Sequence, residues 1–371
     1  MRNILIVACL LALSLYGYSI INVVIALVLL LIICSIYARE LARGPFIFIT
    51  LVLIYLGVDA IYMVVITPDW SIEKATGSAI NNYWQFCVFG MILVFMCNLR
   101  EVLKDVELEG ALQTLIWLHL FFFLAQFVLY YFAGYLIDFS QVLFGHEGRN
   151  MYGSTFRATG LLPEPSTYAG VLCCLLVPYY TYIRKFNLTL ATAILTFLLS
   201  LSTAAWVLAV FFVLAFFLLS EHYSYSSKIK YLSVVFIIIS SLSLVFSDYV
   251  LLQSVKYEDT SPMRILLVNY VFTEREGSLF FFGPGVLTSE KSLFFDLLQN
   301  YRVASTNDSG ALVYIMLKFG LLGGLFYVAI FVYFLFKDKN KAALFLLLSI
   351  TKINPFNPLF IMSFILMKKV K

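Results

Sequence analysis

Long apolar runs separated by short polar turns make up most of the sequence. About 12 such runs can be traced, and most approach the length of about 20 residues that crosses a bilayer as an α-helix. The pattern predicts an all-α fold, a polytopic transmembrane helix bundle of about 12 membrane segments that forms a single integral membrane domain over residues 1–371. The runs lie near 1–15, 19–37, 45–66, 82–98, 111–132, 167–183, 188–201, 203–220, 230–247, 310–336, 341–351 and 356–367.

Two stretches depart from the ordinary span length. The stretch 188–220 is too long for one span, and the Ser202-Thr203 break predicts two short or tilted helices. The last two runs, 341–351 and 356–367, have only about 10 to 12 residues each. They predict tilted half-spans or a re-entrant hairpin, because neither is long enough to cross a bilayer alone.

The composition agrees with a membrane protein and excludes several other classes. With 62% hydrophobic and 12% charged residues and a mean hydropathy of +0.94, the chain has too much apolar surface for a soluble domain. The net charge of +4 does not indicate nucleic-acid binding, because most basic residues lie in short turns and act as topology signals. All 6 cysteines fall inside apolar runs, so no disulfide framework, metal site or cofactor is expected.

The distribution of lysine and arginine predicts the orientation. If both termini are cytoplasmic, the short basic turns all face the cytoplasm, as the positive-inside rule requires. Two long loops, 133–165 and 248–308, then lie on the outer side together with most of the carboxylates. The inner set comprises Arg2, Arg39, Arg43, Arg100, Lys104, Arg184, Lys185, Lys228, Lys230, Lys337, Lys339, Lys341, Lys368, Lys369 and Lys371.

The end of the first long loop carries the most distinctive chemistry. Arg157 precedes Glu164 by seven residues, and Pro165 then predicts the start of an apolar helix, with Ser166 or Thr167 able to cap its free amides. A helix N-terminus beside an arginine suits a phosphate or diphosphate group. This stretch is therefore the candidate site.

The second long loop adds motifs that resemble a known family. It contains a second arginine, Arg264, then the turn Gly283-Pro284-Gly285, then Asn307-Asp308-Ser309 at the start of an apolar run that includes Gly320-Leu321-Leu322-Gly323. Together with the Arg157 to Ser166 stretch, this order resembles the O-antigen polymerase (Wzy) and O-antigen ligase family of polytopic membrane glycosyltransferases. Ligases of that family typically show a His-Asn pair where this chain has Asn307-Asp308, which favours the polymerase.

The resemblance implies an enzyme of the bacterial inner membrane with a periplasmic active site. The expected substrates, both donor and acceptor, are oligosaccharide repeat units linked to undecaprenyl diphosphate, joined by inverting glycosyl transfer without a metal. Membrane lipids and a chain-length regulator protein are the expected partners. A ligase that transfers the chain to lipid A core is the near alternative. A transporter of a lipid-linked sugar is the alternative from another class, although a transporter would carry more polar residues within its spans.

Each candidate residue has a chemical role and an ordinary structural alternative. Positive charge must stabilise the departing diphosphate, and the guanidinium groups of Arg157 and Arg264 are the first candidates, ahead of Arg275 and Arg302. Their alternative is pairing with a neighbouring carboxylate. The attacking sugar hydroxyl needs a general base. The candidates for that role and its surroundings are Glu164, Asp308, His146 and Asn307.

For the two carboxylates the alternatives are structural. Glu164 is otherwise a partner of Arg157 or a helix-dipole charge, and Asp308 is otherwise a helix N-cap. Asp59 lies deep in a span, where a carboxylate is costly unless it has a partner or lines a cavity, so it is a further candidate. Gly320 predicts close helix packing, and Lys318 is expected to reach the outer headgroups or a lipid phosphate.

Overall fold

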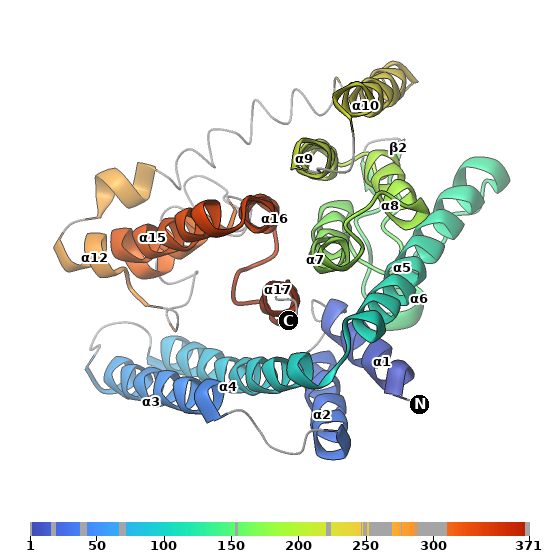
Figure 1. Cartoon of the computed structure of the whole chain (residues 1–371). Helices are drawn as coiled ribbons and strands as arrows, with labels where there is room; N and C mark the ends of the chain where they lie inside the picture. Colours follow the sequence, from blue (N-terminus) through green and yellow to red (C-terminus); the bar gives the residue numbers. More distant parts are fainter. Residues whose placement is uncertain are drawn as a thin grey trace.

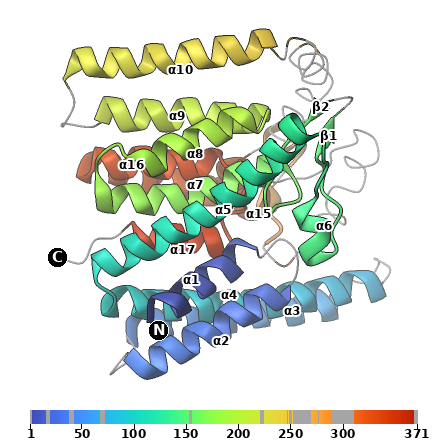
Figure 2. The ribbon, with the colours of Figure 1, turned by 90° about the vertical axis from the view of Figure 1, so that its right-hand side faces the viewer.

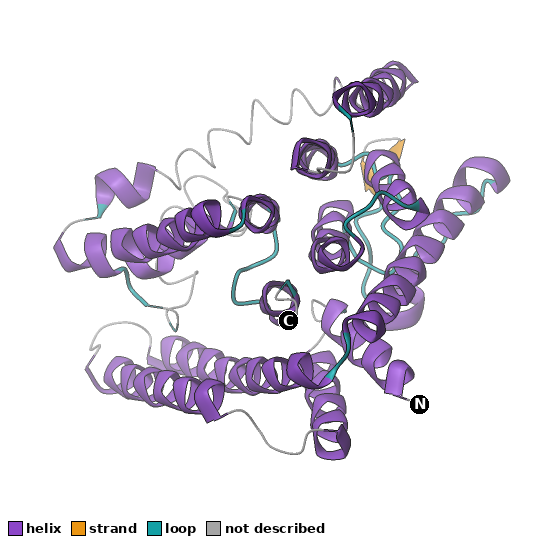
Figure 3. Cartoon of the chain, in the orientation of Figure 1, coloured by secondary structure: helices purple, strands orange, loops and turns teal. Residues whose placement is uncertain are grey.

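The fold is built almost entirely from α-helices. The computed structural model describes residues 2–15, 20–37, 43–66, 72–152, 155–219, 224–245, 247, 251, 269–275, 277–285, 287 and 310–367. The helical content of this part confirms the all-α prediction (Figure 3). Within it, the one exception is the antiparallel pair β1 (Met151–Tyr152) and β2 (Thr155–Phe156).

The helices follow the apolar runs. In the described part they are α1 (Arg2–Ser14), α2 (Ile20–Tyr37), α3 (Arg43–Ile66), α4 (Ile72–Val102), α5 (Asp105–Ala133), α6 (Phe139–Phe144), α7 (Pro165–Ile183), α8 (Leu188–Leu199), α9 (Thr203–Leu219), α10 (Tyr225–Val245), the π-helical turn η2 (Tyr270–Glu274), α12 (Gly277–Phe282), α15 (Ala311–Lys337), α16 (Lys339–Ile350) and α17 (Pro358–Leu366). Within these ranges, 4 helical stretches are long and apolar enough to cross a membrane: Tyr83–Arg100, α5, α7 and α15. Shorter apolar helices accompany them, as expected for a membrane protein.

Helix α7 forms the centre of the bundle. Every residue from Tyr168 to Tyr182 is buried, and α7 contacts α5, α8, α9, α16 and α17. Figure 1 shows α17 beside α7, between α16 and α4. By contrast, α3 and α15 expose large apolar side chains such as Phe48 and Phe326. A helix that is apolar and buried all round is typical of a bundle interior, whereas the exposed apolar faces suit contact with lipid.

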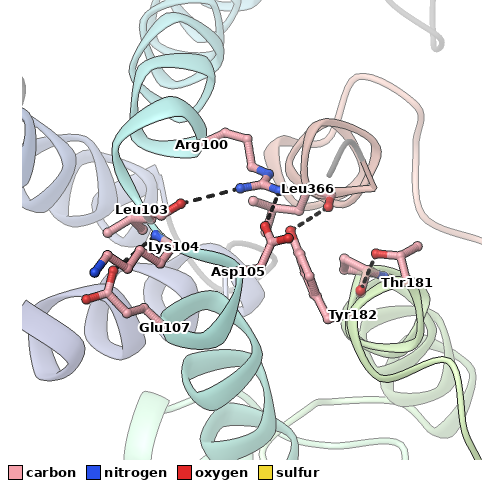
Figure 4. Close-up of polar contacts among 9 residues, drawn as sticks. Arg100, Leu103, Lys104, Asp105, Glu107, Thr181, Tyr182 and Leu366 are labelled. Atoms are coloured by element: carbon pink, nitrogen blue, oxygen red, sulfur yellow. Dashed lines mark hydrogen bonds and ion pairs between the residues drawn. The ribbon is translucent and has the colours of Figure 1, made fainter. Parts of the chain in front are cut away.

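Three turns or helix ends that were predicted to face the cytoplasm lie together at one end of the bundle. Arg100, at the end of α4, forms an ion pair with Asp105 at the start of α5, with 2.6 Å between Nη2 and Oδ1 (Figure 4). The same guanidinium lies 5.5 Å from the ring centre of Tyr182, near the end of α7. The Tyr182 hydroxyl donates to the carbonyl of Leu366, where α17 ends, at 2.7 Å. We call this end the basic end.

The first long loop lies at the opposite end of the bundle. Figure 2 shows α6, β1 and β2 at one end of the parallel helices α7 to α10, while α1 begins and α17 ends toward the other. We call the end with α6 and the two strands the loop end. The separation matches the predicted division between short basic turns and long polar loops.

The prediction of two helices in 188–220 is confirmed. Helix α8 ends at Leu199 and α9 begins at Thr203. Leu201 between them has a φ of 49°, a left-handed conformation that a helix interior does not contain. The Trp206 indole in α9 donates to the carbonyl of Leu198 at 2.8 Å, which joins the two helices across the turn.

The last two apolar runs form short helices joined by a buried turn. Helix α16 has 12 residues and α17 has 9, or about 18 and 14 Å, and neither reaches the roughly 30 Å of a bilayer core. The turn packs on α7, because a Cβ added at Gly170 would lie only 2.9 Å from Cγ1 of Ile353. The Asn354 and Asn357 side chains accept backbone N–H bonds within the turn. Such non-helical backbone is tolerated at membrane depth only where protein covers it.

Candidate functional site

The N-terminus of α7 is recessed below the loop end. The ring of Tyr168, in the first turn of α7, stacks on Phe123 of α5 with the ring centres 4.7 Å apart. Helix α5 continues from Phe123 for 10 more residues to Ala133, or about 15 Å of helix. The loop that follows α5 must therefore run back alongside α5 before α7 begins.

The short hairpin places Arg157 beside the turn that starts α7. The Arg157 amide donates to the carbonyl of Asn150 at 2.7 Å, and its Nη2 donates to the carbonyl of Arg149 at 3.1 Å. The Arg149 amide in turn donates to Pro163 at 2.6 Å. Arg149 thus connects the guanidinium of Arg157 on one side with the residue before Glu164 on the other.

The Arg157 guanidinium is only partly satisfied. It lies over the ring of Tyr152, 5.2 Å from the ring centre, and its side chain is partly exposed. Its Nε atom, however, is buried and has no hydrogen-bond partner. Within the described part of the chain, no ion pair joins Arg157 to Glu164, although that pairing was the structural alternative for both residues. A buried donor without a partner suggests a bound group that completes the site.

Helix α7 begins as predicted, but its N-terminus is uncapped. Glu164 is the N-cap residue and Pro165 is the first helical residue, yet the Glu164 side chain makes no capping hydrogen bond. The expectation that Ser166 caps the helix is wrong, because its Oγ atom is buried and has no hydrogen-bond partner. A helix start has amides with no intrahelical acceptor. Ser166 and Thr167 therefore present unpaired N–H groups next to the free Ser166 hydroxyl.

This arrangement suits an anion. The Nε atom of Arg157, the hydroxyl of Ser166 and the first amides of α7 are all donors, and the helix N-terminus adds a partial positive charge. Guanidinium and backbone amides are the groups that bind phosphate in proteins. Glu164 is at the same turn, and its side chain makes no capping hydrogen bond.

A second polar feature is a break inside α15. Gly320 has φ 62° and ψ −162°, a conformation open almost only to glycine, and it interrupts the helix. A Cβ at Gly320 would lie 2.6 Å from the amide nitrogen of Gly283, so the two backbones are in direct contact. The turn at Gly283-Pro284-Gly285 was expected, and its docking into α15 was not. Gly320 thus packs against the end of helix α12, at Phe280 and Phe281, as the expected close helix packing requires, and also against the turn that follows it.

Two donors cover the carbonyl groups that the break releases. The Gly285 amide donates to the carbonyl of Lys318 at 2.9 Å, and Nη1 of Arg275 donates to the carbonyl of Met316 at 3.2 Å. Burial lowers the pKa of the Arg275 guanidinium, and contact with the Tyr270 hydroxyl partly offsets this shift. Arg275 thus closes the end of the first half of α15. The Lys318 residue is only 4% exposed, so the expectation that it reaches the headgroups is wrong.

The remaining candidates are not brought to the α7 site within the described residues. His146 is exposed in the first loop, and Asp59 lies in α3 with its side chain outside the description. The N-cap of α15 is Gly310, so the alternative role of Asp308 as N-cap is not supported. Four candidates lie outside the described residues: Arg264, Arg302, Asn307 and Asp308.

One residue near the site escaped sequence reasoning. Gln126 of α5 is fully buried, and its Oε1 atom accepts hydrogen bonds from the amides of Thr159 at 2.7 Å and Gly160 at 2.9 Å. Its Nε2 atom donates to the carbonyl of Ile137 at 2.8 Å. The available signal was an isolated amide side chain within a strongly apolar run, which is costly in a membrane unless it has partners.

Comparison with known proteins adds no relative. No protein-family model matches the chain, and no curated protein or solved structure is significantly similar to it. The geometry around Arg157 and the resemblance of short motifs are therefore the basis for a functional proposal.

Proposed function

We propose that this protein is a polysaccharide polymerase of the O-antigen or capsule type. It joins oligosaccharide repeat units carried on undecaprenyl diphosphate, and the single observation that supports this best is the unpaired donors in the loop that leads into α7 and in its first turn. The Nε atom of Arg157 in that loop and the hydroxyl of Ser166 in that turn are each buried without a partner. A lipid-linked diphosphate is an anion that arrives by way of the membrane, and it fits both the donors and the apolar helices around them.

In the proposed reaction, a sugar hydroxyl of one repeat unit attacks the anomeric carbon of a chain held on a second lipid diphosphate. The new glycosidic bond forms as the bond from carbon to the diphosphate oxygen breaks, with inversion at that carbon. Arg157 and the first amides of α7 stabilise the negative charge that develops on the departing diphosphate. The Glu164 carboxylate accepts the proton of the attacking hydroxyl. Arg264 and Asp308 remain candidates for the same two roles.

The proposed topology has about 12 membrane segments in the inner membrane of a bacterium. The basic end faces the cytoplasm and the loop end faces the periplasm, in accord with the positive-inside rule. The clustering of Arg100, Tyr182 and Leu366 at one end supports this arrangement, because three cytoplasmic elements of the proposed topology then lie together.

Complementation of a deletion strain tests the function. Arg157→Ala should abolish long surface polysaccharide on a gel and leave acceptors capped with a single repeat unit, at normal protein levels. Arg149→Ala is the matched control, because Arg149 lies in the same loop, is exposed, and, among the residues that the structure describes, bonds its neighbours through its backbone alone. It should support full-length polymer.

Other outcomes would point elsewhere. Long chains left on the carrier lipid, with no capped acceptor, would indicate a ligase. An unchanged polymer pattern in the deletion strain, or in Arg157→Ala, would contradict the proposal. Accumulation of lipid-linked repeat units on the cytoplasmic side would indicate a transporter.

A further inference from the structure

We propose that Gln126 is a positioning residue for Arg157 and sets the height of its guanidinium relative to the membrane. The inference rests on the proposed function for its catalytic consequence, but its structural part stands independently. Gln126 belongs to a membrane-spanning helix, does not contact Arg157, and lies seven residues before the end of α5 at Ala133.

The amide of Gln126 is fully used by the first loop. Oε1 accepts two backbone hydrogen bonds, from Thr159 and Gly160, and Nε2 donates to Ile137. Ile137 lies in the part of the loop that follows α5, and Thr159 and Gly160 lie in the part that leads into α7. A single buried side chain therefore ties both sides of the loop to α5, about 10 Å below the end of that helix.

Further contacts with α5 fix the same segment. The hydroxyl of Tyr131 donates to the carbonyl of Phe156 at 2.7 Å, and the ring of Tyr130 stacks on Phe156 with the ring centres 4.1 Å apart. At the other end, a Cβ added to Gly160 would lie 3.1 Å from the backbone nitrogen of Phe123, so the loop backbone lies directly on the helix. Segment 156–160 is thus held at both ends.

Arg157 is inside this clamped segment. Phe156 precedes it and Thr159 follows two residues later, and both are bonded to α5. The guanidinium has only one hydrogen bond of its own in the described part of the chain, to the carbonyl of Arg149. The position of the segment on α5 therefore determines where the charge lies, and the Gln126 bonds are the deepest side-chain hydrogen bonds of that attachment.

The structure also predicts which substitutions matter. Gln126→Met keeps the length of the side chain but leaves the amides of Thr159 and Gly160 without an acceptor in a buried position. Gln126→Glu keeps an acceptor for those two amides, and burial favours its neutral form, whose O–H group can donate to Ile137 in place of the amide. Gln113→Met is a matched control on the same helix, because Gln113 bonds to Thr189 of α8 and not to the loop.

The first measurement is amide hydrogen exchange of the purified full-length protein in detergent. Gln126→Met should accelerate exchange at Thr159 and Gly160 by about tenfold or more, because two buried hydrogen bonds are lost. Gln126→Glu should stay near the wild-type rate, and Gln113→Met should not change exchange at these amides. Unchanged exchange in Gln126→Met would overturn the proposal, whatever the protein does in the cell.

The second measurement separates positioning from general stability. In membrane vesicles supplied with lipid-linked repeat units, Gln126→Met should lower kcat/KM by about tenfold or more and Gln126→Glu should restore most of the rate. In an Arg157→Lys background, which keeps the positive charge but not the guanidinium, Gln126→Met should cause a smaller further loss than in the wild type, because the group that it positions is already replaced. Additive losses would show that Gln126 acts on the fold and not through Arg157. If exchange is faster in Gln126→Met but Arg157→Ala keeps its activity, the proposed function is refuted. The inference that Gln126 attaches the loop to α5 then still stands.

Discussion

Arg157 and Arg275 have nearly the same contacts and lie at opposite ends of helices. Each donates one hydrogen bond to a main-chain carbonyl, each lies over a tyrosine ring at 5.2 and 5.0 Å, and each has one buried nitrogen without a partner. Arg157 stands at the start of α7. Arg275 covers the carbonyl of Met316, where the first half of α15 ends.

The helix end decides what each arginine can do. At a helix N-terminus the partial charge is positive, so Arg157 and the amides of α7 reinforce each other in attracting an anion. At a helix C-terminus the partial charge is negative, so Arg275 is already neutralised in part by the carbonyl that it covers. The two arginines also differ in solvent exposure: Arg157 is partly exposed, whereas Arg275 is buried. Similar contacts thus leave Arg157 available for the anion that the proposed function requires, whereas Arg275 covers a carbonyl at the break in α15.

The largest effect is expected where α15 breaks. Gly320→Ala should destabilise the protein by about 3 to 5 kcal/mol, because alanine is strained at this φ and ψ and its Cβ would collide with Gly283. The measurement is thermal unfolding in detergent, followed by size-exclusion chromatography. Gly110→Ala is the control, since Gly110 lies in α5 with open space around it. A stable Gly320→Ala protein would mean that the break is not a fixed part of the fold.

A smaller effect separates the two arginines. Arg275→Met should lower the free energy of unfolding by about 1 to 3 kcal/mol, because the carbonyl of Met316 loses its donor in a buried place. Arg157→Met should leave unfolding nearly unchanged while abolishing polymer. Unfolding curves and polymer gels of the two variants together test this division, and equal losses of stability would contradict it.

At the start of α7, Ser166→Ala should affect the substrate more than the fold. The hydroxyl has no partner, so its removal costs little or nothing in stability. If it binds the diphosphate, the KM for the lipid-linked donor should rise by about threefold to tenfold, the loss expected for one hydrogen bond. Initial rates at varied donor concentration measure this. An unchanged KM would remove Ser166 from the site.

The smallest effect concerns pH and the loop near α7. Burial alone would raise the pKa of Asp138, but hydrogen bonds from the Ser140 hydroxyl and from the amides of Gly148, Gln141 and Ser140 outweigh it and hold the pKa below its ordinary value. The stabilisation is therefore present above the unfolded pKa of about 3.9 and is lost as the pH falls through the lower folded value. Protease cutting of 138–148 should increase only in that acidic range. Asp138→Asn should remove the pH dependence.

The sequence predicted the elements that depend on local rules. Apolar runs gave the helices, Pro165 gave the start of α7, and the Ser202-Thr203 break separated α8 from α9. It did not predict the break at Gly320. A glycine within an apolar run predicts close helix packing, which α12 provides, but nothing local indicates the break in α15 or the approach of Gly283.

The site was predicted only in part, because local sequence rules do not reveal contacts between residues that are far apart in the chain. Arg157, Glu164 and the helix start are close in sequence, so their proximity follows from the turn between them. The attachment to α5 was missed, because the partners of Gln126 are 33 and 34 residues away and nothing local indicates the pairing. Ser166 was assigned to the cap by its residue type, and its side chain instead remains available.

The short helices α16 and α17 have a consequence for biogenesis. Neither helix is long enough to span the bilayer, and the turn between them is non-helical backbone that packs on α7. We therefore expect that the translocon cannot release these two helices into lipid as an independent unit. They have to dock onto helices that were inserted earlier, and a bulky residue at Gly170 would leave a fully translated chain stalled in assembly and exposed to membrane proteases.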